Sequence, residues 1–385
     1  MVGHEKLLGS VNMPNPIVTL ADRFFGRGKY AVTIPAMDGP LLPNSLLDHA
    51  SVVTEVSEPD NLVVAGGNVY FTSGRGIYRL EDDVGGNLLI HEFSSDVTAL
   101  AAKDDGRMVA CLMNGNIAVW REGSAPRVFE DPTRRRLSCL TAIAMGAGDD
   151  VFFTNGSGAN GPKAWAKDLM ERNCSGSVWR FNASTAACTE LARNLGFPTG
   201  VLVRANKLIV SEAWKHRLLS IDLEGKEKAA TLLADLPAYP SRIVPDAEGS
   251  GYWLCLFAPR SQLIEFVLRE HAYRNRMMAE APPEFWIAPA LRSGASFLEP
   301  LQGGGVKRMG ILKPWAPTRS YGLVVKLDAN FHVTESFHSR ADGMRHGITS
   351  VAAMPSGTLV TSKGGNAILT FTAGNAMEST DAARH

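Results

Sequence analysis

Short runs of alternating apolar residues recur along this chain, and their recurrence limits its fold more than any other feature. The clearest copies are NLVVAGGNVYFTSGRGIYRLE at 61–81 and GVLVRANKLIVSEAWKHRLLSIDLEG at 200–225. In each copy the apolar runs have a period of two, and Gly, Asn or Asp lies in the turns between them. Each copy therefore predicts a short antiparallel meander of strands.

Four further stretches follow the same pattern with more variation, which makes six units in all. They are 97–123, 140–158 with an outer strand at 176–185, 242–267 and 348–371. Meanders close readily into a ring, because radial repetition leaves few open strand edges. We therefore predict an all-β fold, a six-bladed β-propeller with short helical insertions.

The predicted propeller is a single domain over residues 1–385, since all-β folds of this size are commonly one domain. Its blades cover about 51–371, after an N-terminal arm at 1–50. Within that arm, GKYAVTIP at 28–35 alternates like a strand. We expect it to supply the outermost strand of the last blade.

A short helix is predicted inside the third unit, at PKAWAKDLMERN, residues 162–173. Its spacing places Trp165 and Leu169 on one face and turns Asp168 and Glu171 away. A longer insert, about 270–317, follows the fifth unit.

The long insert opens with a second predicted helix, HAYRNRMMAEA, which stops at Pro282-Pro283. The rest of the insert is rich in Gly and Pro. Loops of this length in a compact domain are usually lids or binding loops. The alternative is a cover packed over one blade.

Composition excludes several classes of partner. The 385 residues include 39 basic and 39 acidic side chains, so no basic surface for nucleic acid is expected. No apolar run reaches the roughly 18 residues of a membrane helix, so no membrane insertion is expected. The five cysteines are scattered, and the first residues lack the apolar stretch of a signal peptide. These features predict a cytoplasmic protein with reduced thiols; they leave its oligomeric state open.

Several phrases resemble the strictosidine synthase-like family, which shares its propeller with gluconolactonases and paraoxonases. FPTGVLV at 197–203 with VSEAWKHRLLSIDL resembles that family's fourth blade, and LPAYPSRIVPDAEGSGYWLCL at 236–256 its fifth. SYGLVVKLDANFHVTESFH at 320–338, with GITSV after it, resembles its sixth. The resemblance runs from about 60 to 371 and implies a small-molecule pocket where the central channel opens.

The family's functional residues are largely replaced in this chain. Its metal-dependent members imply ligands at positions that match Asp60, Thr141, Thr199 and Ser241. Only the first is a carboxylate, and a hard divalent cation needs more charged oxygen than this set offers. We therefore expect no metal and no other cofactor. The catalytic Glu of true strictosidine synthases is matched by Thr349, so the alkaloid-forming condensation is not expected either.

Residues at the start of each innermost strand are expected to point into the channel mouth. By that rule the pocket draws on Asp60, Asn61, Thr141, Thr199, Arg242, His346 and Thr349. Arg345 is a further ligand-binding candidate, in a polar cluster with Arg340 and Asp342 that is either an anion-binding loop or a solvated turn. Arg242 would replace the metal as the positive centre and pair with Asp60 or with an anionic ligand. The alternative is a surface arginine. His346 is a candidate general base, or a structural histidine.

Two functions fit these residues. The first is a metal-independent hydrolase of a small lactone or ester, in which Arg242 polarises the carbonyl and His346 handles the proton. The second is a non-catalytic small-molecule sensor, or an accessory protein to an uptake system. Both need a small, anionic or carbonyl-rich ligand at the channel mouth.

Overall fold

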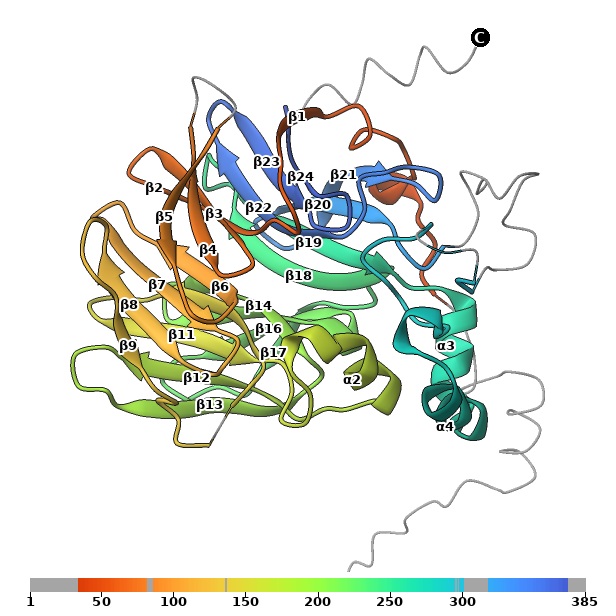
Figure 1. The fold of residues 1–385 in the computed structure, drawn as a ribbon, viewed down its shortest axis with the longest axis horizontal. Coiled ribbons are helices and arrows are strands. Elements are labelled where there is room, and N and C mark those ends of the chain that lie inside the picture. The colour runs from red at the N-terminus through yellow and green to blue at the C-terminus, as the bar shows by residue number, and fades with distance from the viewer. Residues whose placement is uncertain are drawn as a thin grey trace, which may run out of the picture.

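The computed structural model describes residues 34–81, 86–135, 137–294, 296, 298–300 and 318–372. These residues form six four-stranded antiparallel sheets arranged around a central channel (Figure 1). The predicted six-bladed β-propeller is therefore confirmed. Among the described residues, no helix is long and apolar enough to cross a bilayer.

In each of the first three blades the strands follow one another outward from the channel. Blade 1 consists of β2 (Asp60–Ala65), β3 (Asn68–Ser73), β4 (Gly76–Leu80) and β5 (Asn87–Glu92). Blade 2 consists of β6 (Val97–Ala102), β7 (Arg107–Leu112), β8 (Ile117–Arg121) and β9 (Arg127–Phe129). Blade 3 consists of β10 (Leu140–Met145), β11 (Asp150–Asn155), β12 (Gly176–Asn182) and β13 (Cys188–Leu195).

The last three blades use the same order, with one exception in the final sheet. Blade 4 consists of β14 (Pro198–Arg204), β15 (Lys207–Glu212), β16 (Arg217–Asp222) and β17 (Ala230–Leu233). Blade 5 consists of β18 (Ala238–Pro245), β19 (Gly251–Pro259), β20 (Gly322–Asp328) and β21 (Val333–Ser339). Blade 6 consists of β22 (Ile348–Met354), β23 (Gly357–Ser362), β24 (Ala367–Phe371) and, outermost, β1 (Ser51–Glu55).

The helices are short and lie in the connections. They are the 3₁₀ turns η2 (Gly39–Leu41), η3 (Pro162–Ala164), η4 (Ala213–Lys215) and η5 (Pro283–Phe285), and the α-helices α2 (Trp165–Glu171), α3 (Gln262–Arg269) and α4 (His271–Glu280). Both predicted helices are present: α2 lies between β11 and β12, and α4 ends just before Pro282.

Apolar side chains packed between neighbouring blades hold the ring together. In one such cluster, Phe152 and Val178 of blade 3 pack with Leu208 and Val210 of blade 4. All four side chains are almost fully buried. Burying each contributes about 1.5–3 kcal/mol, so the blades stabilise one another rather than folding as separate sheets.

The last blade is closed by a strand from the other end of the chain. The register of β1 on β24 pairs Ser51 with Thr370 and Glu55 with Ala367. The expectation that 28–35 supplies this strand is therefore wrong, because β1 already holds the outermost position. Most of 28–35 lies outside the described residues.

The long insert lies inside blade 5 rather than after it. The run QLIEFV, which the strand pattern assigns to the unit at 242–267, forms α3 instead. Ser261 caps this helix by accepting a hydrogen bond from the backbone N–H of Ile264 at 3.3 Å. Ile264, Val267 and Leu268 are buried on one face, which is a helical spacing. After the insert, 320–338 supplies β20 and β21 of the fifth blade, not the sixth.

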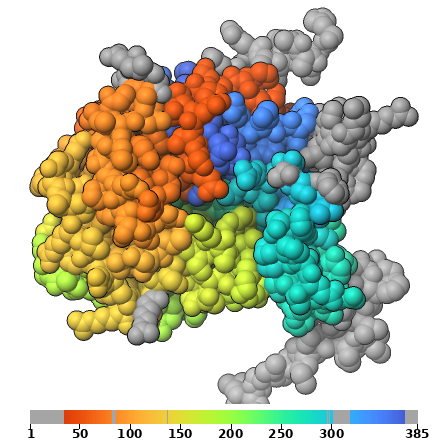
Figure 2. All heavy atoms as spheres, viewed as in Figure 1, coloured from red at the N-terminus to blue at the C-terminus, as the bar shows by residue number. Residues whose placement is uncertain are grey.

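Helices from two different blades meet on the surface of the ring. Figure 2 shows the segment of α2, in yellow-green, beside the segment of α3 and α4, in teal. Leu169 and Met170 of α2 belong to the same buried apolar cluster as Ile264 and Val267 of α3. The insertions of blades 3 and 5 therefore form one packed layer next to the channel.

Candidate functional site

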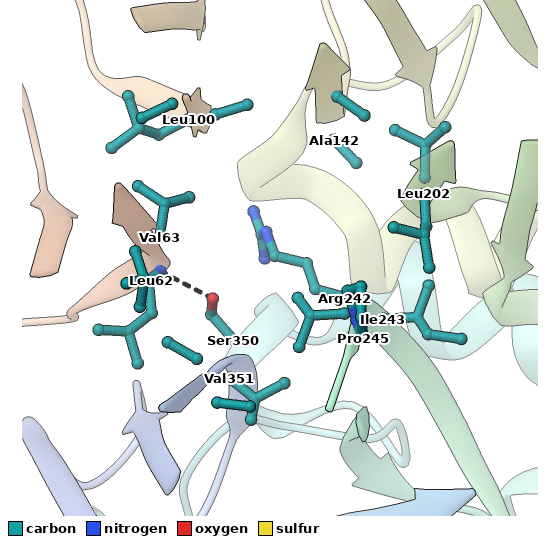
Figure 3. Close-up of a pocket in the computed structure, with 18 of the residues that line it drawn as sticks. Leu62, Val63, Leu100, Ala142, Leu202, Arg242, Ile243, Pro245, Ser350 and Val351 are labelled. Carbon is teal, nitrogen blue, oxygen red and sulfur yellow. Dashed lines mark hydrogen bonds between the residues drawn. The ribbon is translucent and has the colours of Figure 1, made fainter. Parts of the chain in front are cut away.

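The side chain of Arg242 divides the central channel into two cavities. One, of about 510 Å³, lies where the inner strands begin, and we call it the mouth cavity. Its innermost ring consists of Asp60, Thr98, Thr141, Thr199, Ser241 and Thr349. The other, of about 540 Å³, follows the inner strands onward, and we call it the inner cavity. Arg242 lines both, projecting from β18 into the middle of the channel (Figure 3).

Hydroxyl groups at the mouth connect four pairs of neighbouring blades. Thr141, Thr199 and Ser241 each donate a hydrogen bond to a backbone carbonyl of the following blade, at 2.6, 2.8 and 3.0 Å. Thr349 continues the series by donating to Oδ1 of Asp60 at 2.9 Å. The hydroxyls therefore join blades 3 to 6 and then blade 1.

Asp60 is the acidic centre of the mouth cavity. Its Oδ1 lies 2.9 Å from Nη1 of Arg242, and its Oδ2 lies 3.0 Å from Nζ of Lys363. The backbone N–H of Asn61 donates to Oδ1 at 2.8 Å. Burial raises the pKa of Asp60, but the two cations and these hydrogen bonds outweigh burial and lower the pKa to about 2. The carboxylate therefore stays ionised at neutral pH, and the predicted pairing of Arg242 with Asp60 is present.

The guanidinium of Arg242 contacts four blades besides its own. Its nitrogens lie 3.1, 3.3 and 3.4 Å from the backbone carbonyls of Thr98, Thr349 and Thr141, in addition to the contact with Asp60. A planar guanidinium presents several donors in fixed directions, so it can satisfy acceptors that converge from different strands. The side chain of Arg242 therefore separates the two cavities, and its contacts with four other blades hold it in place. We call this side chain the partition.

A calcium-like ion does not fit this set of residues. The mouth ring offers one carboxylate, and that carboxylate is already paired with Arg242 and Lys363. The carbonyls that converge on the channel accept hydrogen bonds from the guanidinium. A divalent cation would have to displace a fixed positive charge and would find mostly neutral oxygens.

The inner cavity has a different chemical character. Each inner strand contributes apolar side chains to its lining, among them Leu62, Leu100, Ala142, Leu202, Ile243 and Val351 (Figure 3). Ser350 lies among them, but its hydroxyl accepts a hydrogen bond from the backbone N–H of Leu62 at 2.8 Å. The charged end of Arg242 is the main polar feature at the border with the mouth.

Three residues expected at the mouth do not line it: Asn61, Arg345 and His346. Asn61 is buried, and its Nδ2 donates to Thr72 at 2.8 Å. The backbone N–H of Arg345 donates to Ser339 at 3.1 Å, and Arg345 lines neither cavity. The rule that inner-strand starts point into the mouth therefore fails at Asn61 and His346, and Arg345 of the polar cluster does not line the mouth either.

Both ring nitrogens of His346, the candidate base, have partners in the protein. Nε2 lies 2.8 Å from the backbone carbonyl of Arg340 and must donate to it, so Nδ1 accepts from the Ser320 hydroxyl at 2.8 Å. Burial lowers the pKa of this imidazole. His346 is thus a neutral, buried histidine that lines neither cavity.

The sequence did not reveal four residues that line the mouth cavity. Lys363, in the turn between β23 and β24, contributes an ammonium group. Trp165, Phe197 and Phe257 form an aromatic wall. The helical spacing of 162–173 places Trp165 on a packed face, and the family resemblance covers Phe197. Neither signal indicated that these rings meet at the channel.

The aromatic wall is supported from behind by a buried carboxylate. Trp214 stacks on Phe197 with ring centroids 4.6 Å apart, and its Nε1 donates to Oδ1 of Asp168 at 2.8 Å. Asp168 is fully buried in α2, so the expectation that it faces away is wrong. The reason is that Asn160, Asn173 and Trp214 supply donors that satisfy it.

No protein-family model matches this chain, and no curated protein matches it in sequence. Solved structures do match its fold. A calcium-binding protein, regucalcin, from Agrobacterium tumefaciens has a TM-score of 0.50 and 13% identity, covering 81% of this chain and 85% of its own. A putative gluconolactonase has a TM-score of 0.50 and 12% identity, covering 83% and 91%. At these identities the likeness shows a shared six-bladed propeller fold.

Proposed function

We propose that this chain is a strictosidine synthase-like propeller that binds a small, anionic or carbonyl-rich molecule in the mouth cavity. The observation that carries the proposal is the floor of that cavity, where Asp60 is shared by two cations, Arg242 and Lys363. The group carries a net positive charge in a partly enclosed space. Cavities of this size in which polar groups converge opposite or beside an apolar wall are typical of small-molecule sites.

Of the two cations at the floor, Lys363 is the more available to a ligand. Its ammonium has three donors, and the structure shows one of them used, toward Asp60. The side chain keeps 27% of its surface exposed. Arg242, by contrast, already serves Asp60 and three carbonyls. In this proposal Arg242 supplies positive potential, and Lys363 supplies the direct hydrogen bond.

Hydrolysis of a lactone or ester is the second candidate, because a putative gluconolactonase shares the fold. Either cation at the floor could polarise a carbonyl. A base is harder to find among the described residues. Asp60, with a pKa of about 2, is a weak base, and both nitrogens of His346 are engaged. We therefore propose binding as the function and treat hydrolysis as an outcome of the test.

A thermal-shift screen tests the proposal. The wild type, Lys363→Met and the control Lys207→Met would be melted with small carboxylic acids and lactones. Lys207 pairs with Glu227 on the exposed surface and lines neither cavity. A ligand present at 100 times its Kd stabilises the folded state by about 2.7 kcal/mol, which raises Tm measurably.

We expect at least one acid to raise the Tm of the wild type and of Lys207→Met but not of Lys363→Met. Equal shifts in all three proteins would contradict the proposed site, and no shift with any compound would contradict the proposed ligand class. Acid release from gluconolactone, followed by titration at constant pH, would show whether hydrolysis occurs. Turnover that survives Lys363→Met would place any hydrolysis elsewhere.

A further inference from the structure

The mouth cavity has two chemically different sides. Blades 1, 2 and 6 contribute Glu58, Asp60, Asp96 and Lys363, which are all charged. Blades 3, 4 and 5 contribute the rings of Trp165, Phe197 and Phe257, together with two cations, the exposed Lys163 and Arg242 at the floor. Lys363 comes from the turn between β23 and β24 of blade 6, whereas the aromatic rings come from elements of blades 3 to 5, so the two kinds of group enter the cavity from different blades.

The aromatic side is rigid before any ligand arrives. Trp165 meets Phe257 edge to face, with centroids 5.4 Å apart and an interplanar angle of 85°. Behind them, Trp214 is held by its stack on Phe197 and by the hydrogen bond to Asp168. Rings fixed in this way lose little side-chain entropy when a flat apolar group packs on them.

The charged groups near the opening of the cavity differ from those deeper inside it. Asp96 is paired with Lys163 at 2.8 Å toward the outside, and Glu58 is exposed beside them. Deeper in the cavity, Arg242 and Lys363 share the single charge of Asp60. The deep part of the cavity therefore attracts an anion, while the outer part does not.

The described part of the long insert narrows the cavity next to Lys363. Leu291 lines the mouth, and its carbonyl lies so close to Gly364 that a Cβ there would come within 1.9 Å of it. Gly347, with φ of 67°, leaves a Cβ distance of 2.8 Å to the same carbonyl. Glycines at these two positions let the insert pack against the turn that carries Lys363, which limits how that lysine can move.

We infer that the ligand is an arylalkyl carboxylate, an aromatic ring joined by a short chain to a carboxylate. The inference rests on the proposed function and specifies its ligand class. The carboxylate binds Lys363 at the floor, and the ring packs on Trp165, Phe197 and Phe257.

Calorimetric titration of the full chain with three probes separates these contributions. 3-Phenylpropanoate has both groups, hexanoate has the charge without the ring, and 3-phenylpropanol has the ring without the charge. We expect 3-phenylpropanoate to bind the wild type about tenfold or more tightly than either partial probe, since the ring and the charge each contribute at least 1.4 kcal/mol. Replacing the lysine should then remove the contribution of the charge, and replacing the tryptophan should remove the contribution of the ring.

Lys363→Met should reduce the affinity for 3-phenylpropanoate to about that of 3-phenylpropanol, roughly tenfold or more. Trp165→Leu should reduce it toward that of hexanoate while leaving hexanoate binding unchanged, which also shows that the mouth is still folded. The matched controls are Lys207→Met and Phe266→Leu, both on the exposed surface.

The outcomes distinguish this inference from the proposed function. If hexanoate binds as tightly as 3-phenylpropanoate, and Lys363→Met abolishes both, the aromatic ligand class is wrong and the anion site stands. If Trp165→Leu weakens hexanoate and 3-phenylpropanoate equally, the wall does not select the ring and the inference is overturned. If none of the acids binds the wild type, both the inference and the proposed function are contradicted.

Discussion

The mouth cavity and the inner cavity are enclosed by the same six inner strands, yet they differ in chemistry. At the mouth, the innermost ring carries the carboxylate of Asp60 and five hydroxyl side chains around the channel. A few residues further along, the lining becomes mostly Leu, Val, Ile and Ala, with Lys103 and Asp246 as charged residues besides Arg242. The change occurs at the depth of Arg242.

The difference between the linings of the two cavities indicates the structural role of Arg242. In a six-bladed ring the strands leave a hollow that side chains must fill or line. Here the apolar part of the hollow needs no polar partner, while the carbonyls and carboxylate at the mouth do. Arg242 supplies that partner from a single residue, and so separates a charged lining from a mostly apolar one.

Removing the partition should destabilise the protein more than any other single change in the lining of the channel. Arg242→Ala leaves Asp60 with Lys363 alone and takes the donors from three carbonyls. Breaking a buried ion pair from one side costs about 3–5 kcal/mol, and the remaining lysine should keep the loss near 3 kcal/mol. Urea unfolding monitored by fluorescence would measure it.

Two further variants sharpen that measurement. Arg242→Lys should recover only part of the loss, because an ammonium cannot serve four acceptors in one plane. Leu202→Ala, in the inner cavity, should cost only about 1–2 kcal/mol, since its side chain is half-buried beside an existing hollow. A smaller loss for Arg242→Ala than for Leu202→Ala would show that the partition is not the stabilising element.

How far these features follow from sequence depends on local geometry. The blade repeat predicts that residues at the start of each inner strand face the channel mouth, and Asp60, Thr141, Thr199, Arg242 and Thr349 do line it. Each lies at or beside a register shift in the pairing of its inner strand with the next strand, so its place in the blade repeat, rather than strict alternation, brings it to the mouth. The fold follows from the alternation of apolar residues, repeated six times.

Asn61 is misplaced because its left-handed φ of 54° turns it away from the mouth, whereas His346 and Lys363 lie outside the strands altogether. Gly347 has a left-handed φ of 67° between His346 and β22, so the direction of the strand's side chains does not extend back to His346. Lys363 lies in a turn, where side-chain direction depends on turn geometry. The role of α3 in blade 5 was hidden because a short apolar run fits a strand as well as a helix.

The free energy of unfolding should depend on pH because Asp60 is held in its ionised form at the floor of the mouth cavity. The pKa of Asp60 is about 2 in the folded protein, against 3.8 for an unperturbed aspartate. A carboxyl whose pKa is lowered by folding stabilises the protein above its unfolded pKa, and this contribution is lost as the pH falls toward the folded pKa. The lowered pKa corresponds to about 2 kcal/mol.

Asp60→Asn provides the comparison, because other carboxyl groups titrate in the same range. The free energy of unfolding of the wild type minus that of Asp60→Asn should fall by about 2 kcal/mol between pH 5 and pH 2. Urea titrations at four or five pH values would give this difference. A gap that stays constant over that range would mean that Asp60 is not held in its ionised form by Arg242 and Lys363.

The smallest effect is expected from calcium. Because the guanidinium of Arg242 lies 2.9 Å from the one carboxylate of the mouth ring, an added divalent ion meets a fixed positive charge before it meets a ligand. Millimolar calcium, or a chelator in excess, should change the Tm of the wild type by less than about 1 °C, because a ligand raises Tm only through its stabilisation of the folded state, RT ln(1 + [L]/Kd).

Arg242→Ala tests whether the arginine alone keeps calcium out. It removes the cation but adds no carboxylate, and Thr141, Thr199 and Ser241 still offer only neutral oxygens. We therefore expect this variant to stay insensitive to calcium as well. A calcium-dependent rise in Tm of several degrees in the wild type would show that the mouth ring is a metal site; the same rise in Arg242→Ala alone would show that the arginine, and not the scarcity of carboxylates, is what excludes the ion.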